Sequence, residues 1–109
     1  MSRPARPGRV ETPALVAGVD VDRVAVAVAA CPLVAGLLPG EHGTHATLLP
    51  GRKVEGIRVL ADGPGTARVA VMVAAHYGAP MSRLVEQVRS AVGVHAPGHP
   101  VDVTVADVA

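Results

Sequence analysis

The clearest alternation of apolar and polar residues lies in the second half of the chain. Residues 67–77 carry an apolar side chain at every second position, which is the spacing of one face of a β-strand. These positions are Val69, Val71, Val73, Ala75 and Tyr77. Residues 54–61 have the same strand character, and the Asp-Gly-Pro-Gly cluster at 62–65 is typical of a turn. The two runs therefore predict a β-hairpin.

A helical pattern follows this hairpin. Apolar side chains recur every three or four positions within residues 81–92, with polar residues on the opposite side. The apolar stripe consists of Met81, Leu84, Val85, Val88 and Val92. Pro80 suits the first turn of a helix, and Gly93 is a plausible C-terminal stop.

The last alternating run covers residues 101–107. Val101, Val103 and Val105 alternate there with Asp102, Thr104 and Ala106. This pattern predicts a strand with one face in the core and one face in water. Strand 67–77, helix 81–92 and this strand form a β-α-β unit, whose two strands should be parallel.

The first half contains an uninterrupted apolar run at residues 24–38. An aspartate at 20 or 22 can cap a helix there, Val24, Val28 and Cys31 share one helical face, and Pro32 ends it. Residues 33–38 then read as an extended segment. The run has 15 residues and contains Pro32 and Gly36, which break helical structure, whereas a membrane span needs about 20 apolar residues. We therefore expect no direct membrane span.

These elements together predict an α+β fold. We expect a two-layer sandwich in which a mixed sheet of three to four strands carries two helices on one face, in the order α-β-β-β-α-β. A short strand at 44–49 and a Pro50-Gly51 turn complete it. Residues 1–19 are expected to be a disordered arm with room for a short edge strand, and 20–109 a single domain.

Composition limits the core and the partners. Half of the 109 residues are hydrophobic, but Phe and Trp are absent and Tyr77 is the single tyrosine. Small aliphatic side chains bury little area each, so we expect modest stability or self-association. The net charge of +1 gives little attraction to nucleic acid, and the sequence offers no aromatic platform for stacking bases. Cys31 is the single cysteine, which excludes an internal disulfide and suits a reducing cytoplasm.

Histidine and cysteine supply the candidate catalytic or metal-binding groups. His42 and His45 form an H-x-x-H pair that would need Cys31 to approach a zinc set, so solvated loop histidines are the preferred interpretation. His76 could pair with Asp102 on the predicted sheet. Cys31 at a helix C-terminus is a poor nucleophile, because the helix dipole disfavours a thiolate there. We expect no cofactor, no metal and no catalytic residue.

Two further motifs have competing interpretations. Gly51-Arg52-Lys53 places two cations at a turn, which could contact an anion or a protein, although a solvated turn is the default. Val28-Ala29-Ala30-Cys31 is similar to a lipoprotein cleavage site with arginines upstream. The acidic residues between those arginines and the site fit a signal peptide poorly.

One face of the predicted sheet is a candidate interaction surface. The side of strand 67–77 opposite the helices would carry Arg68, Ala70, Met72, Ala74 and His76. Its centre is less polar than a surface exposed only to water needs to be, and apolar patches often mark contact sites. The alternative is that residues 10–19 or a loop cover this face.

Several segments of the chain resemble one known family. They are Cys31-Pro-Leu-Val-Ala-Gly-Leu37, Leu49-Pro-Gly-Arg-Lys-Val-Glu-Gly-Ile-Arg-Val59, Val69-Ala-Val-Met-Val-Ala-Ala-His-Tyr-Gly-Ala-Pro80, the helix 81–92 and Val101-Asp-Val-Thr-Val-Ala-Asp-Val108. Over residues 20–108 the chain resembles the alkaline shock protein family of bacterial envelope stress response proteins, in a short actinobacterial form. The Tyr-Gly-x-Pro step before the helix is the most specific part.

The resemblance implies a non-enzymatic cytoplasmic protein. Members of that family act in cell-envelope homeostasis; some self-assemble, and some are held at the membrane by a small anchor protein. We therefore expect a protein-binding or self-assembling scaffold, peripheral at the membrane only through a partner. The alternatives are a small metal- or His-dependent enzyme and an exported lipoprotein.

Overall fold

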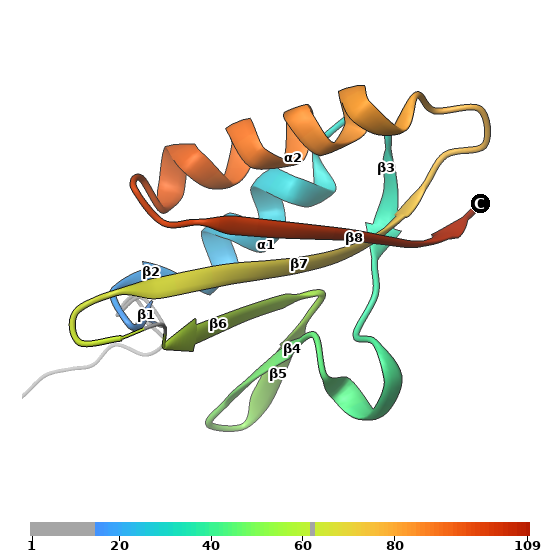
Figure 1. Cartoon of the computed structure of the whole chain (residues 1–109). Helices are drawn as coiled ribbons and strands as arrows, with labels where there is room; N and C mark the ends of the chain where they lie inside the picture. The colour runs from blue at the N-terminus through green and yellow to red at the C-terminus, as the bar shows by residue number, and fades with distance from the viewer. Residues whose placement is uncertain (1–14, 62) are drawn as a thin grey trace, which may run out of the picture.

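The computed structural model describes residues 15–61 and 63–109 of the chain (Figure 1). The elements follow one another as β1 (Leu15–Val16), β2 (Val19–Asp20), α1 (Val21–Ala29), β3 (Val34–Leu37), the 3₁₀ turn η1 (Glu41–Gly43), β4 (Ala46–Leu49), β5 (Arg52–Glu55), β6 (Ile57–Ala61), β7 (Ala67–Ala75), α2 (Met81–His95) and β8 (Val101–Val108).

Strand β7 is the centre of the main sheet. β8 pairs with it in parallel along one side. On its other side, β6 pairs antiparallel with residues 67–71, and β3 pairs antiparallel with residues 73–75. Both helices lie on one face of this mixed four-stranded sheet (Figure 1). The predicted α+β fold and the parallel β-α-β unit are confirmed.

β3 and β6 run in the same direction and share one side of β7. The change from one to the other occurs at Met72, whose carbonyl accepts the Leu38 N–H at 2.9 Å. The Met72 N–H in turn donates to the Gly56 carbonyl at 2.9 Å. Residues 38–56 leave the sheet between these two contacts, and they form η1 and the β4–β5 hairpin before the chain returns.

Gly56 is the point of return, and it corrects the prediction of a single strand over residues 54–61. Its φ of +85° is in the left-handed region that favours glycine, and a Cβ there would lie 2.6 Å from Leu37 Cβ. Its N–H donates to the His45 carbonyl at 2.6 Å. The chain therefore bends between β5, which pairs with β4, and β6, which pairs with β7.

The core lies between the sheet and the helices and consists of small aliphatic side chains. α1 contributes Val21, Val24 and Val28, α2 contributes Leu84, Val88 and Val92, and β7 contributes Val69, Val71 and Val73. All nine are fully buried. Asp20 caps α1 by accepting the Arg23 N–H at 3.2 Å, as one of the two predicted caps. Cys31 is buried just beyond the end of α1.

Two predicted boundaries at either end of α2 are wrong. β7 ends at Ala75, and Tyr77 lies in the following turn with 88% of its surface exposed, so it does not face the core. α2 continues through Gly93 to His95. Ala96 then leaves helical geometry, because the residue before Pro97 is forced away from it.

The start of the described chain is a small hairpin. β1 and β2 pair only with each other, so residues 15–20 add no edge strand to the main sheet. Val19 is fully buried, and Val16 packs against the same core. The arm was predicted to be disordered over residues 1–19. Its residues 1–14 lie outside the described part of the chain.

We expect Gly56→Ala to destabilise the protein more than Gly51→Ala. Both glycines have a left-handed φ, but a Cβ at Gly51 meets nothing within 4 Å. Gly51→Ala should cost about 1–2 kcal/mol from backbone strain alone. Gly56→Ala should cost about 1–3 kcal/mol more from crowding against Leu37. Urea unfolding of both variants measures the difference, and equal losses would contradict the close contact.

Candidate functional site

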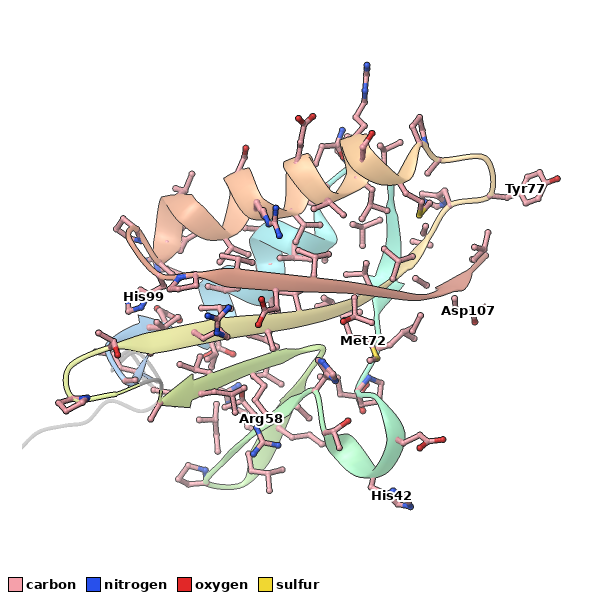
Figure 2. The ribbon with its side chains drawn as sticks, in the orientation of Figure 1. His42, Arg58, Met72, Tyr77, His99 and Asp107 are labelled. Atoms are coloured by element: carbon pink, nitrogen blue, oxygen red, sulfur yellow. The ribbon has the colours of Figure 1, made fainter. Side chains whose placement is uncertain are left out.

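The sheet face opposite the helices carries a defined set of side chains. Strand pairing places Arg58 and Leu60 of β6, Arg68, Ala70 and Met72 of β7, and Asp102 and Thr104 of β8 on this face. We call these seven residues the helix-free face. Figure 2 shows Met72 and Arg58 on the side of the sheet away from the helices.

The helix-free face has an apolar centre with charged neighbours. Met72 is half-buried, and Leu60 keeps 39% of its surface exposed. Arg68 and Asp102 form an ion pair across β7 and β8, with 2.9 Å between the guanidinium nitrogen and the carboxylate oxygen. Ala70 is buried among these larger neighbours. The arrangement offers apolar contact area with a charged margin.

The five predicted interaction residues are divided by the structure. Arg68, Ala70 and Met72 belong to the helix-free face. Ala74 is buried at the end of β7, opposite Gly36, and His76 lies beyond the strand with an exposed side chain. The suggested cover does not come from residues 15–19, since Val16 and Val19 pack into the core on the helix side.

The groups considered as alternative catalytic or metal-binding sets are not brought together. The carboxylate of Asp102 is taken by Arg68, so the suggested partner of His76 is already paired. Cys31 Sγ lies 3.6 Å from the carbonyl oxygens of Ala27 and Gln87. Burial raises the pKa of the Cys31 thiol, which disfavours the reactive thiolate. Within residues 15–61 and 63–109, no three His, Cys, Asp or Glu side chains are grouped to hold a metal ion.

His42 instead lines a pocket of about 580 Å³ with cations from two other elements. Lys53 of β5 and Arg58 of β6 also line it, together with Leu48 and Val59. No carboxylate is among its lining residues, so the chemistry suits an anion better than a metal ion. Lys53 is already 3.4 Å from Glu55, which reduces the positive charge available there.

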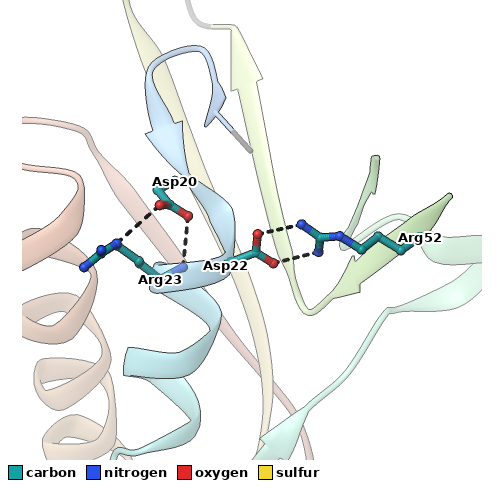
Figure 3. A network of polar contacts seen from close by, with 4 residues as sticks. All are labelled: Asp20, Asp22, Arg23 and Arg52. Atoms are coloured by element: carbon teal, nitrogen blue, oxygen red, sulfur yellow. Dashed lines mark hydrogen bonds and ion pairs between the residues drawn. The ribbon is translucent and has the colours of Figure 1, made fainter. Parts of the chain in front are cut away.

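The two cations of the Gly51-Arg52-Lys53 turn have defined partners. Arg52 donates two hydrogen bonds of 2.7 Å to the two carboxylate oxygens of Asp22, in the first turn of α1 (Figure 3). This bidentate pair ties the β4–β5 hairpin to the helix layer. The hydrogen bond from Arg52 lowers the pKa of Asp22 below its usual value of 3.8.

Sequence reasoning missed the contributions of β6 and the hairpin. Leu60 and Arg58 join the face because the antiparallel register places them opposite Arg68 and Ala70. The Asp-Gly-Pro-Gly cluster at 62–65 could have indicated this register, since a hairpin turn sets the register of both strands. Nothing in the sequence pairs Arg52 with Asp22, 30 positions away.

Comparisons with known proteins leave the chain unassigned. No protein-family model matches it, and no curated protein or solved structure matches it either. In the described part of the chain, neither helix has the length and apolar character needed to cross a membrane. The family resemblance stays a prediction, and the helix-free face stays the candidate site on geometric grounds.

We expect Asp22→Asn to lower stability slightly at pH 7, because exposed ion pairs contribute little. The pKa of Asp22 is lower in the folded state than its usual value of 3.8. Its contribution to the free energy of unfolding is therefore present above pH 3.8 and is lost as pH falls through the folded-state pKa. Wild type and variant should therefore converge in unfolding midpoint at acidic pH. In an Arg52→Gln background the substitution should have no further effect; a full effect there would exclude the ion pair as the cause.

Proposed function

We propose that this protein is a non-enzymatic scaffold that binds a protein partner or its own copies in the bacterial envelope stress response. The observation that carries the binding role is the helix-free face, where Met72 and Leu60 offer apolar area beside the Arg68–Asp102 ion pair. The envelope stress context is supported by the sequence resemblance alone.

The arrangement of layers supports a binding role. Both helices cover one side of the sheet, and in the described residues no helix covers the other. Interfaces commonly combine a dehydrated apolar centre with a polar margin. Met72 and Leu60 would form such a centre, and Arg58, Arg68 and Asp102 would form its margin.

The small side chains of the core provide a physical reason to expect self-association. Val and Ala side chains fill the interior, and each buries less apolar area than an aromatic residue. A small domain with such a core gains stability when a partner covers further apolar surface.

We also propose that the protein lies in the cytoplasm, peripheral at the membrane through a small anchor protein.

We expect Met72→Glu and Leu60→Glu to lower the molar mass of the assembly measured by light scattering. A carboxylate in the apolar centre would have to be dehydrated on binding, and its desolvation opposes association. Val94→Glu is the matched control, because Val94 is 73% exposed on α2 in the helix layer. Thermal unfolding identifies any variant that fails to fold.

The partner is tested by affinity purification from the native host with membranes retained. Wild type and Val94→Glu should recover the same partner, and Met72→Glu should lose it. Equal recovery by all three proteins, together with unchanged molar masses, would refute the helix-free face as the binding surface.

A further inference from the structure

The outer edge of β8 is a second surface, whose outward backbone groups pair with no other described strand. β8 has eight residues and pairs with β7 alone among the described strands. Figure 1 shows it as an outermost strand of the main sheet. Edge strands are usually protected from pairing with another chain by lysine, proline, other charges or bulges. Residues 101–108 contain no lysine or proline, and their register shift lies beyond Val105.

The direction of each backbone group on β8 follows from its register. The Val69 N–H donates to the Pro100 carbonyl at 2.9 Å, and Val69 is paired with Val101. Positions 100 and 102 therefore face β7 in this parallel ladder, and positions 101, 103 and 105 turn their N–H and C=O groups outward.

Both ends of this outer edge are capped by side chains. Arg89 Nε of α2 lies 3.4 Å from the outward Val101 carbonyl and donates to it. Near the other end, Asp107 accepts the N–H of Val108 at 2.8 Å, beyond a register shift that ends the regular ladder after Val105. Figure 2 labels Asp107 at this end of the strand. The open stretch is therefore limited to Val103 and Val105.

We propose that this stretch joins two copies of the chain through antiparallel pairing of β8 with β8 about a two-fold axis at Thr104. In that register Val103 of each copy meets Val105 of the other, which forms about four backbone hydrogen bonds. The inference rests on the proposed scaffold function, because it names the first partner as a second copy.

The side chains of β8 fit a second copy in this register. Thr104 meets Thr104 across the axis, and threonine pairs are favourable in antiparallel sheets. Asp102 comes opposite Ala106, so no two carboxylates face each other directly. Both copies would carry their helices on the same side, because the axis is perpendicular to the sheet. Their helix-free faces would then form one continuous surface of double width.

Proline substitution at outward positions tests the backbone pairing. Val103→Pro removes an N–H that faces away from β7, so the ladder within the monomer is kept. We expect it to weaken dimerisation at least about tenfold in sedimentation equilibrium, since it removes two of the four bonds. Val101→Pro is the matched control, because it removes an outward N–H outside the open stretch and should leave the dimer intact.

Charge exchange at Thr104 tests the register. Thr104→Glu alone and Thr104→Lys alone should each be monomeric, because like charges would meet across the axis. An equimolar mixture of the two should associate. Stronger dimerisation by Thr104→Lys alone would contradict this register, because it would place residue 104 opposite Asp102.

The outcomes separate this inference from the proposed function. A wild-type protein that stays monomeric at every concentration refutes the β8 dimer. A dimer that is disrupted by Leu60→Glu but not by Val103→Pro also refutes it and leaves the helix-free face as the binding surface. Disruption by Val103→Pro without any effect of Leu60→Glu supports the β8 dimer and counts against the helix-free face.

Discussion

The fold depends on the contacts made by the backbone of β7 at Met72. There the Met72 carbonyl accepts a hydrogen bond from Leu38 at the end of β3, and its N–H donates to Gly56 before β6. Gly56 can approach because it has no Cβ, and Leu37 occupies the space that a Cβ would need. One side of β7 is thereby completed by two strands. Residues 38–56 become an excursion that leaves the main sheet intact.

This arrangement determines which surfaces remain for binding. One lateral side of β7 is paired with β3 and β6. The helices cover one face of the sheet and bury it in a valine-rich core. The Asp22–Arg52 pair ties the excursion to α1, and the excursion meets the helix-free face at Arg58, which donates to the Thr44 carbonyl at 3.3 Å. The helix-free face and the outer edge of β8 are two surfaces that this arrangement leaves open. Pairing at the edge would make the two faces continuous, so both surfaces could serve one assembly.

The elements with long, regular periodicity could be predicted from the sequence. β7, β8 and the buried stripe of α2 follow from their alternation, because a strand or helix with one buried face must repeat its apolar residues. The division of residues 52–61 at Gly56 could not be predicted, since it depends on contacts with Leu37 and Met72 in other elements. The prediction that Tyr77 faces the core was wrong because it extended the apolar alternation beyond Ala75, where the strand ends. Arg58 and Leu60 were missed because the hairpin register, which places them opposite Ala70 and Arg68, was not followed onto the helix-free face.

The central claim about this protein is that two copies join through the outer edge of β8. Amide hydrogen exchange measured by NMR at low and high protein concentration tests it most directly. We predict slow exchange at Asp102 and Thr104 under both conditions, because their N–H groups face β7. Val103 and Val105 should exchange fast in dilute solution and become protected as concentration rises. Exchange at Val103 and Val105 that does not change with concentration would contradict pairing through the outer edge of β8.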